Sequence, residues 1–102
     1  MSGLTSRQRS HLRSAAHALA PVVLVGRAGA TEAVVCEVDD ALAARELIKI
    51  RLAGDRDERQ RTAAAIAERT GAELAGTIGR IAILYRQSPD PSRRRVALPP
   101  GR

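Results

Sequence analysis

In this 102-residue chain, the residues best suited to binding a ligand form the loop Gly26-Arg27-Ala28-Gly29. Two glycines three positions apart leave little side chain on the loop, so a phosphate-bearing ligand can approach its backbone. Thr31 then begins a predicted helix, whose first N–H groups would point toward the same ligand. Arg27 adds a positive charge within the loop. We therefore expect the loop to hold phosphate groups.

The spacing of the two glycines argues against a nucleotide cofactor. A dinucleotide fold requires G-x-G-x-x-G after the strand, and a Walker loop requires a lysine that is absent here. A G-x-x-G loop does clamp a nucleic-acid backbone in KH domains, where it joins two helices. Here the loop follows the apolar stretch Val22–Val25, which predicts a strand. The loop thus predicts a nucleic-acid backbone as its ligand, in a different fold and without a cofactor.

The charge of the chain also favours a polyanionic partner. Lys plus Arg number 17 and Asp plus Glu number 11, which gives a net charge of +6 and an isoelectric point near 11.2. The excess lies at the two ends, because residues 1–17 contain three arginines and no acid, and residues 86–102 contain five arginines and one acid. Such a distribution is typical of nucleic-acid binding. Arg9 and Arg13, four positions apart on one helical face, are candidate contacts.

Other chemistries have little support in the sequence. Cys36 is the only cysteine, so neither an internal disulfide nor a thiolate metal cluster is expected. His11 and His17 have no carboxylate or cysteine partner nearby in the sequence, so we expect no metal and no catalysis. No apolar run is long enough to span a membrane, and the first residues do not resemble a signal peptide. We expect a cytoplasmic monomer.

Periodicity and capping signals predict seven elements. Thr5 and Gln8 form a capping box that begins a helix to about residue 18. The clean alternation in the strand Glu46–Ala53 predicts one covered sheet face and a second face, with Lys49 and Arg51, that is partly wet. The expected elements are helices at about 5–18, 31–45 and 59–70 and strands at 22–25, 46–53, 72–78 and 81–86, with a tight hairpin turn at Gly79-Arg80. Asp55 or Asp57 is expected to cap the third helix, and Gly71 is expected to end it.

This order, α-β-α-β-α-β-β, predicts an α/β fold, a two-layer sandwich with a four-stranded mixed sheet. Residues 1–86 would form one domain. Residues 87–102 contain four of the five prolines and an arginine triplet, which is typical of a disordered basic tail.

The chain also resembles a known family. The segments "PVVLVG", the G-x-x-G loop, "TEAVV", "ELIKIRL" and "TGAELAGTIGRIAILYR", in this order, look like the CRM domain and more narrowly like the stand-alone bacterial YhbY-type proteins. The resemblance runs through almost all of residues 4–86. It implies a fold similar to the C-terminal domain of bacterial translation initiation factor three. It also implies RNA binding, association with precursors of the large ribosomal subunit, and no catalysis.

The resemblance assigns roles to particular residues. The family's loop corresponds to Gly26-Arg27-Ala28-Gly29, and Ala20 departs from the family, whose members often have lysine there. The basic positions of the family correspond to Arg9, Arg13, Lys49, Arg80 and Arg86.

The sequence therefore predicts a non-enzymatic protein that binds ribosomal RNA and assists assembly of the large subunit. In this hypothesis the loop cradles phosphates, and arginines of the first helix close around them. The alternative is a protein-interaction module that acts through the acidic face of the second helix, with Glu37, Asp39 and Asp40.

Overall fold

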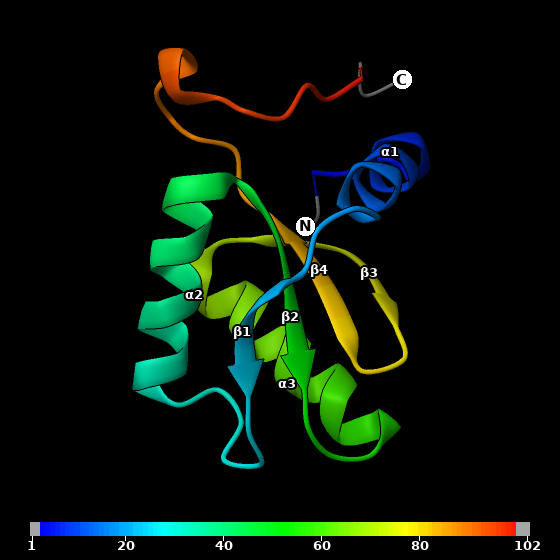
Figure 1. Ribbon diagram of the computed structural model, residues 1–102, viewed down its shortest axis with the longest axis vertical. Coiled ribbons are helices and arrows are strands. Elements are labelled where there is room, and N and C mark those ends of the chain that lie inside the picture. Colours follow the sequence, from blue (N-terminus) through cyan, green and yellow to red (C-terminus); the bar gives the residue numbers. More distant parts are fainter. Residues whose placement is uncertain (1–2, 100–102) are drawn as a thin grey trace.

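The computed structural model describes residues 3–99 (Figure 1). Three α-helices and four β-strands alternate as predicted, and a short 3-10 helix follows them. The elements are α1 (Ser6–Ala16), β1 (Pro21–Val25), α2 (Glu32–Arg45), β2 (Leu47–Leu52), α3 (Arg56–Thr70), β3 (Glu73–Ile78), β4 (Ile81–Tyr85) and the 3-10 helix Pro91–Arg93.

Polar side chains begin the three α-helices where the sequence predicts them. Thr5 and Gln8 form a complete capping box at α1. The hydroxyl of Thr31 accepts a hydrogen bond from the backbone N–H of Val34 at 3.2 Å and so begins α2. Asp55, one of the two caps that the sequence allows, begins α3 with a second capping box, so α3 starts about one turn earlier than expected. These caps satisfy N–H groups that the first helical turn leaves free.

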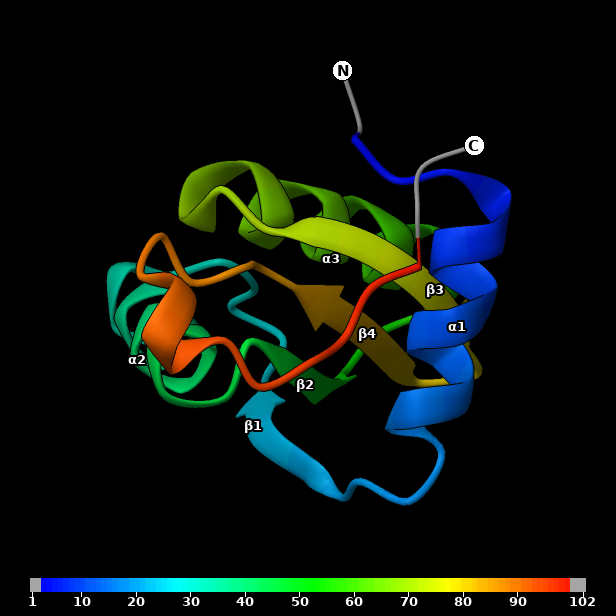
Figure 2. The same cartoon turned by 90° about the horizontal axis from the view of Figure 1, so that it is seen from above.

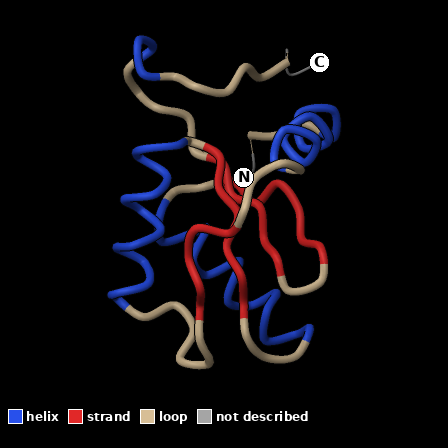
Figure 3. Tube along the Cα trace, viewed as in Figure 1, coloured by secondary structure: helices blue, strands red, loops and turns tan. Residues whose placement is uncertain are grey.

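The four strands form one mixed sheet with the order β1-β2-β4-β3. β1 runs parallel to β2, while β4 is antiparallel to both β2 and β3. β1 and β3 are therefore the two opposite edges, as the trace in Figure 3 also shows. The loop after β1 and the hairpin between β3 and β4 lie at the same end of the sheet (Figure 1).

Helices lie on both faces of the sheet. α2 and α3 cover the first face, where an aliphatic core includes Val38, Ile50 and Leu84. α1 packs against the second face over β3, β4 and β2 (Figure 2). Leu12 of α1 and Ile83 of β4 belong to one apolar cluster between this helix and the sheet. The predicted α/β fold with a four-stranded mixed sheet is confirmed. The sheet with α2 and α3 forms two layers, and α1 forms a further layer on the other side of the sheet.

The C-terminal segment makes contacts where the sequence predicts a disordered tail. Val96 and Leu98 pack against the apolar cluster beneath α1. The side chain of Gln8 donates a hydrogen bond to the carbonyl of Pro99 at 2.9 Å. The overall composition of this segment, rich in proline and arginine, suggests disorder, but it does not reveal that two apolar residues, Val96 and Leu98, can pack against the domain. Residues 100–102 of the expected tail lie outside the described residues.

No helix within residues 3–99 has both the length and the apolar character needed to cross a bilayer.

Candidate functional site

The loop at residues 26–29 is an exposed tight turn between β1 and α2. The backbone N–H of Gly29 donates to the carbonyl of Gly26 at 3.0 Å, and the N–H of Thr31 donates to the carbonyl of Gly29 at 2.9 Å. Gly26, Arg27 and Ala28 are exposed. The guanidinium of Arg27 has no hydrogen-bond or ion-pair partner in the described part of the chain. The loop thus presents bare backbone and one free cation to solvent.

Only one of the two loop positions requires glycine for its backbone conformation. Gly29 has φ +73°, a backbone conformation that a Cβ makes unfavourable. Gly26 is not among the described residues with positive φ, and a Cβ built on it would meet no atom within 4 Å. The turn therefore needs glycine at 29, whereas nothing in the fold itself requires one at 26.

The N-terminus of α2 next to the loop is not purely positive. Glu32 lies in the first turn, where its charge interacts favourably with the helix dipole but repels a phosphate. Arg69 of α3 forms an ion pair with Glu32 and donates a hydrogen bond to the carbonyl of Ala30 at 2.6 Å. Arg69 therefore neutralises this acid and fixes the chain just after the loop.

Hydrogen bonds connect the loop to the rest of its end of the sheet. The N–H of Ala53 donates to the carbonyl of Val25 at 3.0 Å, and the N–H of Leu52 donates to the carbonyl of Arg80 at 2.7 Å. The loop and the hairpin residue Arg80 thus share one rim. The side chain of Arg80 is exposed and has no partner among residues 3–99.

A strip of the second sheet face is left open beside α1. On β1, Val22 and Leu24 are 38% and 73% exposed. On β2, Lys49 is half-buried and Arg51 is exposed, and the strand alternation places both on this face. We call Val22, Leu24, Lys49 and Arg51 the open strip. It leads from the rim at Gly26–Gly29 toward the C-terminal end of α1.

The two cations of the open strip have different surroundings. The ammonium of Lys49 donates to the carbonyl of His17 at 3.4 Å, just past the end of α1, where the helix dipole favours a cation. Arg51 lies beside Leu24 of β1 and Ile81 of β4 in the strand register, and its guanidinium has no partner among the described residues. Of the two cations in the open strip, Arg51 is therefore the one whose side chain is available to a ligand.

The structure does not bring Arg9 and Arg13 to the loop, which corrects the expectation that they close around a phosphate there. Arg13 lies over β3, where its guanidinium donates to the carbonyl of Ala75 at 3.1 Å. Arg9 donates to the carbonyl of Leu4 at 2.9 Å. The reason is the strand order, because α1 lies over β3 while the loop follows β1 at the opposite edge.

Arg86 is also separate from the loop, at the other end of the sheet. Its guanidinium forms an ion pair with Asp39 of α2 and donates to the carbonyl of Thr70 at 2.7 Å. Arg86 therefore joins β4 to both helices of the first face. The same ion pair engages one of the three acids that the alternative hypothesis assigns to a partner protein.

Sequence reasoning gave Arg51 no role beyond the alternation of its strand. The signal was present, since Arg51 shares its face with Lys49, but the strand order that leaves this face open near β1 was unknown. Among residues 3–99, no group of three or more His, Cys, Asp or Glu could hold a metal ion.

Comparison with known proteins identifies the family. Residues 4–86 match the family model of the CRS1/YhbY (CRM) domain. The chain belongs to the CRM-domain family. The resemblance found in the sequence is thereby confirmed, and the match spans α1 through Arg86, loop included.

Relatives of similar length support this membership. A protein of Haemophilus influenzae that is named an RNA-binding protein is 44% identical over 89 residues, which cover 86% of this chain and 90% of the relative. YqeI of Bacillus subtilis is 36% identical over 86 residues, covering 83% of this chain and 90% of that protein. The solution structure of SAV1595 from Staphylococcus aureus has a TM-score of 0.80 at 33% identity and covers 92% of this chain and 99% of its own.

Proposed function

We propose that this CRM-domain protein binds RNA through the loop at residues 26–29 and the open strip. The single observation that carries the proposal is the free guanidinium of Arg51 on the uncovered part of the sheet, next to a loop with bare backbone. CRM-domain membership and the name of the Haemophilus influenzae relative support RNA as the partner.

Phosphates are the groups that this surface is suited to hold. A ribose-phosphate backbone can approach Gly26, where no side chain intervenes, and reach exposed N–H groups at the start of α2. Arg27 and Arg51 supply charge, and Arg80 extends the positive rim. Such contacts position RNA by its backbone and shape rather than by its sequence. Base stacking on Tyr85 is not available, because that side chain is only 3% exposed.

The resemblance to YhbY-type proteins supports a more specific role. In our proposal the RNA is that of the large ribosomal subunit or its precursor particle, the site of action is the cytoplasm, and the protein acts as a monomer without catalysis. The surface fits this role because its arginines and exposed backbone N–H groups can contact the phosphates of a folded RNA. In-cell crosslinking followed by sequencing of the attached RNA tests the assignment, and crosslinks confined to other RNAs would contradict it.

Removal of one cation from the open strip tests the RNA interface directly. Arg51→Ala should lower affinity for a structured ribosomal RNA fragment severalfold, because one phosphate contact is lost. Arg61→Ala is the matched control, since Arg61 is an exposed arginine on α3 that forms no hydrogen bond or ion pair with the described residues. Equal affinities of the two variants in fluorescence anisotropy would contradict the proposed interface.

A further inference from the structure

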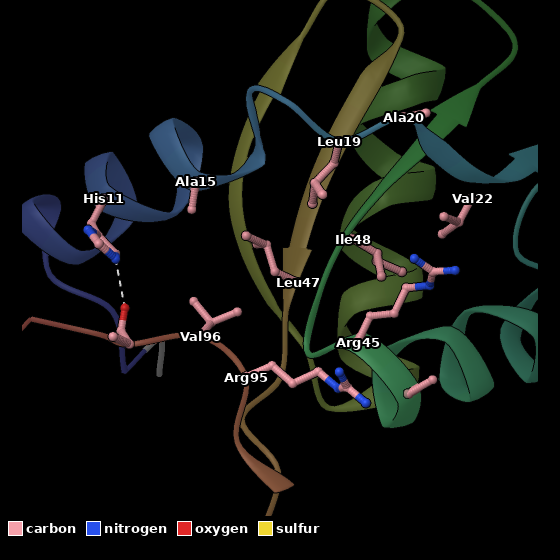
Figure 4. A pocket seen from close by; sticks show the side chains of 12 residues that line it. His11, Ala15, Leu19, Ala20, Val22, Arg45, Leu47, Ile48, Arg95 and Val96 are labelled. Carbon is pink, nitrogen blue, oxygen red and sulfur yellow. Dashed lines mark hydrogen bonds between the residues drawn. The ribbon is translucent and has the colours of Figure 1, made fainter.

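A groove of about 940 Å³ opens between α1, the start of β1, the end of α2 and the C-terminal segment (Figure 4). The C-terminal segment supplies one wall, and this part of the chain lies beyond the region that matches the CRM domain. The lining is apolar except for His11, Arg45 and Arg95.

Two unpaired cations flank the groove. Arg45 comes from the end of α2 and extends toward Ile48 and Val22, and Arg95 comes from the C-terminal segment, so each arginine lines the groove from its own element (Figure 4). Both residues are exposed, and neither guanidinium has a hydrogen-bond or ion-pair partner among residues 3–99. No acid lines the groove. An anionic group between the two arginines would meet attraction from both and repulsion from none of the lining residues.

Apolar side chains form the rest of the wall. Leu19 and Val22 are each 38% exposed, which is high for large aliphatic residues. Val96 lies across the groove from them, beside Leu47 (Figure 4). A ligand that fits must therefore combine an anion with a flat or apolar body. A nucleotide of single-stranded RNA has both, a phosphate and a base that can be splayed out of the chain.

Arg95 is held in position by a buried carboxylate. Glu46, at the junction of α2 and β2, is 1% exposed and has φ +63°. Its side chain accepts hydrogen bonds from the backbone N–H groups of Ser88, Arg95 and Val96. His11 of α1 forms a hydrogen bond with the carbonyl of Ala97 at 2.7 Å and fixes the next residue as well. The wall is thus ordered before any ligand arrives, which lowers the entropic cost of binding.

We infer that this groove binds one single-stranded nucleotide of the RNA, with its phosphate between Arg45 and Arg95 and its base against Leu19, Val22 and Val96. The inference rests on the proposed function. Val22 belongs to both the groove and the open strip, so the two surfaces are continuous. The C-terminal segment thereby extends the RNA footprint from the loop to the end of α1.

The experiment titrates the full chain with a four-nucleotide oligouridylate and follows backbone amide and methyl resonances by NMR. We expect shifts at Leu19, Val22 and Val96, the three side chains that the base would contact. In the double variant Arg45→Ala/Arg95→Ala the dissociation constant should rise at least about tenfold, because the charged contacts of both guanidinium groups with the phosphate are lost. The control Arg7→Ala/Arg61→Ala removes the same charge from exposed arginines that do not line the groove, and it should change affinity much less.

Several outcomes would contradict a nucleotide site in the groove and leave the proposed RNA binding at residues 26–29 unaffected. Shifts confined to residues 26–29, or no shifts at all, would exclude a nucleotide site here, while the Arg51 variant still tests RNA binding. Equal losses of oligouridylate affinity in both double variants would show that only the net charge of the protein matters, and not the position of Arg45 and Arg95. An oligoglutamate peptide that shifts the three methyl groups when the oligouridylate does not would assign the groove to an acidic protein partner instead.

Discussion

The carboxylate of Glu46 accepts a hydrogen bond from the backbone N–H of Val96 at 3.0 Å, across 50 positions of the chain. This contact joins the end of α2 to the C-terminal segment on the second face of the sheet. Burial raises the pKa of Glu46, but the N–H groups of Ser88, Arg95 and Val96 and the nearby charge of Arg94 together hold that pKa below its ordinary value. The ionised carboxylate is therefore the form that holds the segment.

Acid should release the C-terminal segment. Because the folded-state pKa of Glu46 lies below the ordinary value of 4.5, the contacts contribute fully above that value and are lost as the pH falls through the folded-state pKa. Hydrogen-exchange protection of the Arg95 and Val96 amides, corrected for intrinsic rates, should fall over this interval. Glu46→Gln, which cannot ionise, serves as the control. An equal loss of protection in that variant would show that another group is responsible.

Gly26→Ala and Gly29→Ala should separate binding from folding. Alanine at 26 meets no atom within 4 Å, so the free energy of unfolding should change by no more than about 0.5 kcal/mol, while RNA affinity falls because a Cβ blocks the approach of the backbone. Alanine at 29 must adopt φ +73° and should cost about 1–2 kcal/mol of stability. Urea unfolding and RNA titration check both variants. Unchanged RNA affinity in Gly26→Ala would argue against close contact at the loop.

Arg86 and Arg80 should have opposite effects. Arg86→Ala removes the ion pair with Asp39 and the hydrogen bond to the carbonyl of Thr70, so stability should fall by about 1–2 kcal/mol with little change in RNA affinity. Arg80→Ala should leave the free energy of unfolding within about 0.5 kcal/mol and weaken RNA binding. Denaturant unfolding and anisotropy titrations measure the pair. A large loss of RNA affinity in a folded Arg86→Ala variant would show that Arg86 does contact RNA.

The salt dependence of binding should report the cations of the interface. For single-stranded RNA the slope of log K against log salt is about −0.7 for each phosphate neutralised. Arg27→Ala/Arg51→Ala should therefore reduce the steepness by about 1.4. Anisotropy titrations at several salt concentrations give the slope. An unchanged slope would mean that neither guanidinium contacts a phosphate.

Much of the fold could be read from local signals. Thr5, Thr31 and Asp55 mark helix starts because their side chains satisfy free N–H groups, and Gly71 ends α3 in the left-handed conformation with φ +73°. These features depend on neighbouring residues alone, so the sequence reveals them.

The candidate site was less predictable because it depends on the strand order. Charge patterning placed Arg9 and Arg13 in a binding role, yet the order β1-β2-β4-β3 carries α1 away from the loop. The same order leaves Arg51 on an open face. The contacts of Val96 with the domain depend on Glu46, and no local pattern connects residues so far apart.

The most direct test of the central claim replaces both middle residues of the loop, in the variant Arg27→Asp/Ala28→Asp. Both side chains are exposed, so the fold should be retained, as circular dichroism can verify. Two new negative charges should repel phosphates and abolish binding to a ribosomal RNA fragment in an anisotropy titration. Wild-type affinity in the folded double variant would contradict RNA binding at the loop.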